Sequence, residues 1–179
     1  MSKFVLFIAL TTFLSTAAFA GPATVTAQRC GVNQSNRPQH ILATPDGNAW
    51  RTYGTVSEIP DLSTDGGESA NYWTGQDGNV LVSTFELGED FYIYTDYCFD
   101  RSGRLIQLRF EIRTAWGWGF REEGPVAGDT LKPATSGFFN TSSDEPTAKP
   151  DGANDIPEAM KPKLCLRISS LPFAKLLGK

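Results

Sequence analysis

The sequence predicts a single, mainly β domain: a central antiparallel meander sheet with a short C-terminal helix and long irregular flanks. Two observations lead to this prediction. Of the 17 aromatic residues beyond position 20, 12 lie between Tyr72 and Phe120, so the middle third supplies most of the core. In that stretch short apolar or alternating runs are separated by clusters of turn-forming residues. A two-layer α+β arrangement of sheet and helix is the alternative.

Three strands are predicted in this middle third. Residues 80–87 and 91–99 are rich in aromatic and β-branched side chains, and Gly88 begins the break between them. Residues 104–114 alternate apolar and polar side chains most regularly. Short turns join the three runs, so we expect neighbouring strands of one sheet.

The turn between the second and third strands leaves their register open. Asp100 and Gly103 suit a type I turn with a left-handed glycine, which places Asp100 opposite Arg104. That register puts the even-numbered residues of 92–98 on the apolar face of the third strand. A shift by one residue puts the odd-numbered residues of 91–97 there, and the hydrophobic pattern favours this second register.

Residues 97–105, which contain this turn, resemble a single YD-type hairpin of the RHS repeats. Repeat proteins of this kind need many copies at a fixed period, and no second copy follows in the chain. The resemblance therefore indicates shared turn chemistry.

The flanks predict less regular structure. We expect a short strand within residues 50–56, a loop over 61–70 and a surface excursion over 133–163, which holds five of the 11 prolines. Residues 164–168 alternate and predict a last strand. Ser170 then begins a short helix that Gly178 ends, and its apolar side chains are expected to cover the second face of the sheet.

Residues 1–20 have the pattern of a signal peptide. Lys3 is their only charged residue, an apolar stretch follows, and Ala18 and Ala20 supply the small residues that signal peptidase requires. We predict cleavage after Ala20, which leaves residues 21–179 as a single exported domain, secreted or periplasmic. No later segment is apolar enough for a membrane anchor.

Three cysteines allow one internal disulfide and one free thiol. Spacing does not choose among the three pairings. Cys30–Cys98 is favoured, because Cys30 lies in a polar N-terminal segment that needs tethering. The chain has no CxxC pair and His40 is its single histidine, so we expect no metal site and no cofactor.

Composition excludes several classes of function. The formal net charge is −4 with 16 basic residues, which argues against binding nucleic acid, since phosphate neutralisation needs clustered Lys and Arg. A chain of 179 residues is too short for a multidomain enzyme. It also carries no nucleophile elbow, no phosphate-binding loop and no dinucleotide fingerprint.

The most unusual segment is 114–124, where two Trp and one Phe alternate with Gly before a charged trio. On a strand the three rings share one face, as a platform for a sugar with the charged residues at its rim. The alternative is a core strand whose glycines let another segment approach closely. The candidate ligand-binding residues are Trp116, Trp118, Phe120, Arg121 and Glu122.

The leading hypothesis is an exported, non-catalytic binding or structural module that uses this segment, with a carbohydrate or protein partner. A second is a small secreted hydrolase that uses Asp96 and Glu111 or Glu122, although ion pairing with Arg109 is the simpler role for the first two. A third is a secreted inhibitor or partner-binding protein. An enzyme should place two carboxyls in a cleft, one with a raised pKa. A binding module should instead expose a Trp.

Overall fold

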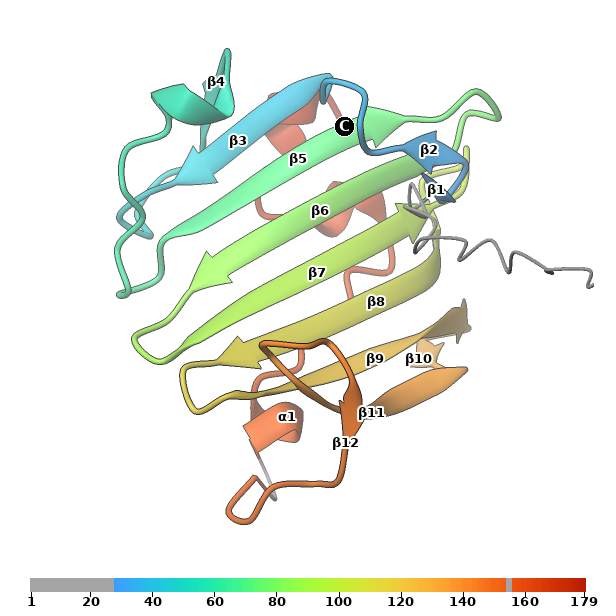
Figure 1. Ribbon diagram of the computed structural model, residues 1–179. Coiled ribbons are helices and arrows are strands. Elements are labelled where there is room, and N and C mark those ends of the chain that lie inside the picture. Colours follow the sequence, from blue (N-terminus) through green and yellow to red (C-terminus); the bar gives the residue numbers. More distant parts are fainter. Residues whose placement is uncertain (1–27, 154–155) are drawn as a thin grey trace, which may run out of the picture.

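The computed structural model describes residues 28–153 and 156–179, and its main element is one antiparallel sheet (Figure 1). The predicted signal peptide and the cleavage after Ala20 lie outside the described residues. The sheet has ten strands in the order β12-β11-β9-β8-β7-β6-β5-β3-β4, with β10 paired to β9. The mainly β class, the antiparallel meander and the single domain are confirmed.

The meander consists of β5 (Glu68–Thr74), β6 (Val80–Leu87), β7 (Phe91–Phe99), β8 (Leu105–Thr114) and β9 (Trp118–Ala127). The outer strands are β3 (His40–Thr44), β4 (Arg51–Tyr53), β10 (Thr130–Leu131), β11 (Thr135–Asn140) and β12 (Pro146–Thr147). A separate ribbon is formed by β1 (Gln28–Arg29) and β2 (Val32–Asn33). The helical elements are the short α1 (Ile156–Ala159) and the 3₁₀ turns η1 (Val56–Glu58), η2 (Ile168–Ser170) and η3 (Ala174–Leu177).

The β7–β8 hairpin satisfies both of the registers that compete in the sequence. Asp100 pairs with Arg104 through a backbone hydrogen bond of 2.8 Å, and Gly103 is left-handed with φ 76°, as the turn residues predict. A bulge follows, because Phe99 pairs with Leu105 whereas Cys98 pairs with Gln107. Ile106 is the extra residue, and it shifts the rest of the hairpin by one position. The odd-numbered residues of β7 therefore join the apolar face, as the hydrophobic pattern predicts.

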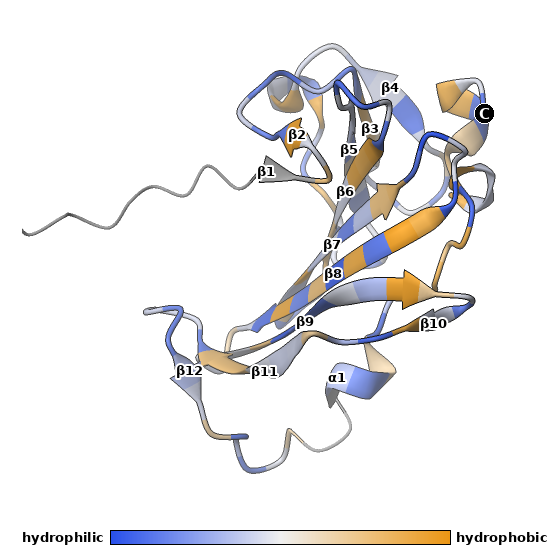
Figure 2. Ribbon diagram, turned by 90° about the vertical axis from the view of Figure 1, so that its right-hand side faces the viewer, coloured by the Kyte–Doolittle hydropathy of each residue, from blue (hydrophilic) through white to orange (hydrophobic). Residues whose placement is uncertain are grey.

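One face of the sheet, called the inner face here, carries the main core. It is covered by residues 160–179, called the C-terminal segment here (Figure 2). Residues paired across antiparallel strands point to the same face, so Leu42, Ala70 and Phe110 lie together on it. From the C-terminal segment, Phe173 and Leu177 are buried in one hydrophobic cluster with Leu42 and Ala70. The C-terminal segment therefore docks on the sheet as expected, but it covers the apolar face that carries Leu108 and not the second face.

The C-terminal segment differs in detail from the prediction. Its helical part consists of the 3₁₀ turns η2 and η3, and η3 starts after Phe173 instead of at Ser170. Gly178 ends η3 in a left-handed conformation, as expected. The strand predicted over 164–168 is wrong: among the described residues, its one strand pairing is an isolated bridge between Arg104 and Arg167. Proline at 172 and a chain that must cross the strands favour turns over a long helix or a paired strand.

Two flanking predictions are also corrected. The loop expected over 61–70 ends early, because β5 begins at Glu68 and pairs with both β3 and β6. The excursion over 133–163 contains β11, which extends the sheet beyond β9. In both places the pairing comes from a partner strand, and the local Gly and Pro content conceals it.

The opposite face, called the outer face, holds the N-terminal segment at one end. Cys30 and Cys98 form the favoured disulfide, with a Cα–Cα distance of 5.6 Å. Beside it Val32 packs on Trp73 and Leu81 as a small separate core. Cys165 is the free thiol. A disulfide indicates an oxidising environment, and no helix among the described residues is long and apolar enough to cross a membrane.

Candidate functional site

The tryptophan–glycine segment is divided between surface and core. Trp116 lies in the turn between β8 and β9 and is 55% exposed, whereas Trp118 and Phe120 on β9 are buried against Phe138. Gly119 allows the close approach expected of these glycines, since a Cβ there would lie 2.3 Å from the ring of Phe139. Of the three rings, only that of Trp116 is exposed enough to contact a partner.

The two charged candidates after the rings point to opposite faces. Arg121 lies on the outer face, where its Nε donates to Glu111 at 2.7 Å and its guanidinium lies 4.6 Å above the ring of Phe139. Glu122 lies on the inner face, buried, with Lys161 Nζ 3.0 Å away. Neither side chain therefore forms a rim around Trp116.

Replacing Trp116 with Phe is expected to remove most of the fluorescence that acrylamide quenches, because Trp116 is exposed whereas Trp50 is half-buried and Trp73 and Trp118 are buried. Trp118→Phe is the matched control. It should leave quenching unchanged but lower the free energy of unfolding by about 1–2 kcal/mol, since it removes buried ring atoms. Stern–Volmer plots of both variants check this, and strong quenching that survives Trp116→Phe would contradict it.

Two carboxylates of the hydrolase hypothesis, those of Asp96 and Glu111, are held in an ion-pair network on the outer face, whereas Glu122 lies on the inner face. Arg109 contacts Asp96 at 3.6 Å and also bonds Glu111, as the simpler interpretation predicts. Arg113 and Arg121 bond Glu111 as well, at 2.6 and 2.7 Å. Burial opposes ionisation of Glu111, but the three guanidinium groups outweigh it and lower its pKa. Such a carboxylate stays ionised, which is the opposite of what a general acid needs.

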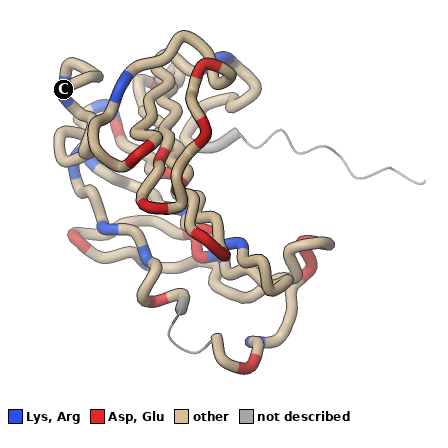
Figure 3. Tube along the Cα trace, turned by 90° about the vertical axis from the view of Figure 1, so that its left-hand side faces the viewer, with Lys and Arg blue, Asp and Glu red and all other residues tan. Residues whose placement is uncertain are grey.

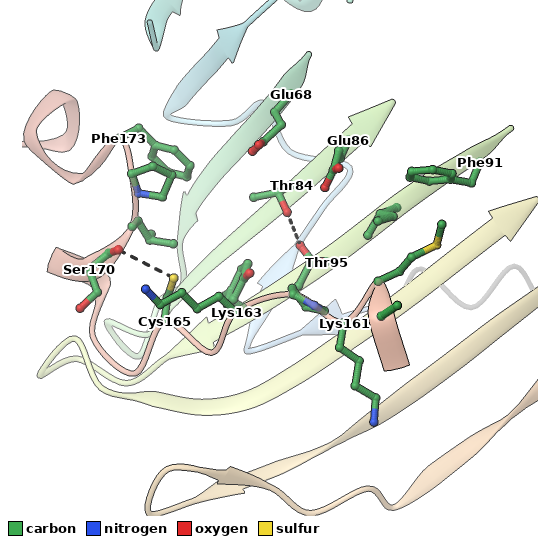
Figure 4. A pocket seen from close by; sticks show the side chains of 17 residues that line it. Glu68, Thr84, Glu86, Phe91, Thr95, Lys161, Lys163, Cys165, Ser170 and Phe173 are labelled. Atoms are coloured by element: carbon green, nitrogen blue, oxygen red, sulfur yellow. Dashed lines mark hydrogen bonds between the residues drawn. The ribbon is translucent and has the colours of Figure 1, made fainter. Parts of the chain in front are cut away.

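The inner face contains a cavity of about 670 Å³ between β5, β6 and β7 and the C-terminal segment (Figure 4). Its walls combine apolar and polar side chains, and the acidic ones lie on β5 and β6. The walls on the sheet are Glu68, Thr84, Glu86, Phe91, Ile93, Thr95 and Tyr97. Opposite them lie Met160, Cys165, Leu171, Pro172 and Phe173. A cavity of this size is in the range of small-molecule sites.

Glu68 and Glu86 are the charged groups on the sheet side of this cavity. They are directly opposite each other on β5 and β6, and both are half-buried. Desolvation raises the pKa of both carboxyls, and the charge of Glu86 raises the pKa of Glu68 further. Like charges opposite each other on neighbouring strands destabilise a sheet. The pair therefore carries an electrostatic cost that a bound cation would relieve.

The basic residues that line the cavity do not neutralise this pair. Lys161 extends away from both glutamates, as Figure 4 shows, and its Nζ is bound by Glu122 at 3.0 Å and Glu158 at 2.9 Å. Lys163 is directed sideways, past Cys165. Within residues 28–153 and 156–179, no ion pair joins Glu68 or Glu86 to a basic side chain.

The remaining polar groups of the cavity are neutral. Burial raises the pKa of Tyr97 and of Cys165, so the phenol and the thiol both stay protonated at neutral pH. The Cys165 thiol donates to the Ser170 carbonyl at 3.8 Å. Thr84 donates to the Thr95 carbonyl at 3.4 Å. The two glutamates are thus the negative groups that a ligand in this cavity meets.

The sequence did not predict this site, because neither the strand that contains Glu68 nor the strand pairing of Glu86 is evident from it. Glu68 follows Gly66 and Gly67, and these glycines predict that it belongs to a loop. The weak alternation of apolar and polar side chains over residues 68–73 is the signal that could have revealed β5. Glu86 lies in a correctly predicted strand, but its partner is set by the β5–β6 register, which the sequence leaves open.

Replacing Glu86 with Gln is expected to stabilise the protein at pH 7 by less than about 1 kcal/mol and to have no effect near pH 3.5. A raised pKa means that the folded state binds the proton more tightly than the unfolded chain. The stability of the wild type therefore falls as pH rises from the ordinary value of 4.5 through the raised pKa. Urea unfolding at both pH values checks this, with exposed Glu89→Gln as control. An equal gain at both pH values would contradict it.

Comparison of the chain with protein families, with curated proteins and with solved structures found no match. Among the described residues, no group of three or more His, Cys, Asp or Glu side chains is placed to hold a metal ion. The arguments for function therefore rest on the cavity and the surfaces of this chain.

Proposed function

We propose that the protein is an exported, non-catalytic binding protein whose inner cavity takes a small molecule with an apolar body and a protonated amine. The observation that carries this proposal is the opposed pair Glu68 and Glu86 at one side of a cavity whose other walls include the apolar side chains of Phe91, Ile93, Met160, Leu171 and Phe173. Apolar walls favour burial of a hydrocarbon body, and an ammonium group between the carboxylates offsets their repulsion.

Calorimetric titration at pH 7 with octylamine, and with octanol as the uncharged control, tests this function. Octylamine is expected to bind about tenfold more tightly than octanol, because only the amine pairs with the carboxylates. Glu86→Gln should reduce this preference, while Glu89→Gln, in the exposed turn after β6, should keep it. Equal affinity for both probes, or an unchanged preference in Glu86→Gln, would refute the proposal.

Export is the second part of the proposal. It is supported by the signal-peptide pattern of residues 1–20 and by the Cys30–Cys98 disulfide, which persists in oxidising compartments. Mass spectrometry of the protein from an expressing bacterial cell tests it. A secreted or periplasmic form that begins at Gly21 is expected, and a cytoplasmic form that retains Met1–Ala20 would contradict the proposal.

A hydrolase is the second candidate, favoured by the same two glutamates instead of Asp96, Glu111 or Glu122. In such an enzyme one carboxyl with a raised pKa acts as acid and an ionised neighbour acts as nucleophile, and Glu68, whose pKa both burial and the charge of Glu86 raise, would be the acid. Release of nitrophenol from a panel of nitrophenyl glycosides and esters tests it. Turnover that Glu68→Gln abolishes would support this candidate over simple binding.

The exposed Trp116 supports a further contact with a carbohydrate or protein partner. Its ring lies 6.0 Å from that of Trp118, and both line a shallow depression of about 450 Å³ with Pro150, Asp151 and Gly152. An amphipathic ring beside a polar residue is typical of partner contacts. Such a contact also fits the inhibitor or partner-binding hypothesis.

A further inference from the structure

The outer face of the sheet carries a second concavity, a shallow groove of about 540 Å³. Two segments lie on this same side of the sheet, one at each end (Figure 2). One contains β1 and β2, and the other is the loop between β11 and β12. Both are held in place: Cys30 by the disulfide to Cys98, and Asp144 of the loop by Arg113 at 2.5 Å. The groove is therefore preformed, which reduces the entropy cost of binding.

Four polar side chains form the floor of the groove as one row across four neighbouring strands. Asn71 of β5 pairs with Ser83 of β6, Ser83 with Asp96 of β7, and Asp96 with Arg109 of β8. The Gln34 amide donates to Ser83 Oγ at 3.1 Å, and Ser83 donates to Asp96 at 2.6 Å. Asn71 Oδ1 is buried and has no donor among the described residues. Asn71, whose side chain lines the groove, therefore has a hydrogen-bond acceptor that the described residues leave unused.

The charges of the groove balance. Asp96 and Glu111 are matched by Arg109 and Arg113, and ion pairs already join them. Figure 3 shows acidic and basic residues side by side in the middle of the sheet. A balanced site gains no net attraction for a polyanion or a polycation, in contrast to the paired carboxylates of the inner cavity. It favours an uncharged ligand that both donates and accepts hydrogen bonds.

Aromatic rings flank the polar row. Tyr94 lines the groove and is 38% exposed, and Tyr92, two residues earlier on the same face, is 46% exposed. Phe85 supports both rings, with centroid distances of 5.0 Å to Tyr94 and 5.9 Å to Tyr92. Exposed rings held by a neighbouring ring on the same face offer flat apolar surface to the C–H face of a pyranose.

We propose that this groove binds a neutral oligosaccharide, with one sugar ring stacked on Tyr94 and hydroxyls bonded to the row from Asn71 to Arg109. This inference is independent of the amine ligand proposed for the inner cavity. Planar amide, carboxylate and guanidinium groups beside an aromatic ring match a polyhydroxylated ligand that has one apolar face.

NMR titration of the labelled protein with cellotetraose, maltotetraose and chitotetraose tests this proposal. At least one tetrasaccharide is expected to bind with a Kd near or below about 1 mM. It should shift the amide signals of Asn71, Ser83 and Asp96 while those of Glu68 and Glu86 stay in place. Absence of binding by all three sugars, or shifts confined to residues 115–119, would overturn the proposal.

Variants separate this groove from the Trp116 surface. Tyr94→Ala is expected to weaken sugar binding about tenfold, whereas Tyr94→Phe, which keeps the ring, should bind as the wild type does. Trp116→Ala is the matched control and should leave affinity unchanged. Loss of binding in Trp116→Ala with normal binding in Tyr94→Ala would assign the sugar to the Trp116 surface and overturn the proposal. Amine binding in the inner cavity should be unaffected by Tyr94→Ala, so the two proposals fail separately.

Discussion

Replacing Cys30 and Cys98 together with Ala is expected to lower the free energy of unfolding by about 4 kcal/mol. The two cysteines are 68 positions apart, so the disulfide removes much of the freedom of the unfolded chain. It also fixes the N-terminal segment, whose buried Val32 has few other neighbours in the core of Trp73 and Leu81. Urea unfolding of the oxidised wild type and the double variant, at one pH, measures the difference.

Cys165→Ala is the control for this prediction. The free thiol is half-buried and makes one weak hydrogen bond, so its loss should cost less than about 1 kcal/mol. If reduction of the wild type lowers stability no more than Cys165→Ala does, the disulfide is not a major source of stability. A double variant that loses stability should also lose the expected sugar binding, because Gln34 reaches the groove from the segment that Cys30 holds.

The second large effect is expected at the ion pair between the C-terminal segment and the inner face. Lys161→Ala should destabilise the protein by about 3 kcal/mol, because it leaves the carboxylate of Glu122 buried without a counter-ion. The Glu122 side chain is 7% exposed and that of Lys161 34%, so the expected cost is at the lower end for a buried pair. Thermal and urea unfolding at neutral pH measure it.

Two further variants test this reasoning. Lys163→Ala removes a lysine of the same segment that has no ion pair among the described residues, and it should change stability little. Adding Glu122→Gln to Lys161→Ala should recover a large part of the loss, since a neutral amide is less costly to bury than a charge. A loss that persists in full in this double variant would show that Lys161 acts through packing of its carbon chain.

The central strands were predictable from the sequence because their signal is local. β6 and β7 have the predicted bounds and β8 differs by one residue, since alternation and turn chemistry act within each strand. The register of the β7–β8 hairpin was not predictable. Two valid local signals disagreed there, and a bulge at Ile106 reconciles them at a position that neither signal marks.

The candidate site was predictable only in part. The disulfide and the pairing of Arg109 with Asp96 and Glu111 were expected, because a tether and opposite charges at matching strand positions follow from the pattern. The inner cavity was not predictable, because it depends on how the C-terminal segment crosses the sheet and on which residue of β6 pairs with Glu68. Both are long-range choices that no single stretch of the chain specifies.

The strands at the two ends of the sheet order determine how this protein meets other copies of itself. A wide open sheet is prone to fibril growth wherever an edge presents a row of unpaired N–H and C=O groups. Here β4 has three residues and includes Arg51, and β12 has two and includes Pro146, which has no N–H to offer. Each edge is thus a poor template for a further strand, which disfavours extension of the ten-stranded sheet by a second copy of the chain.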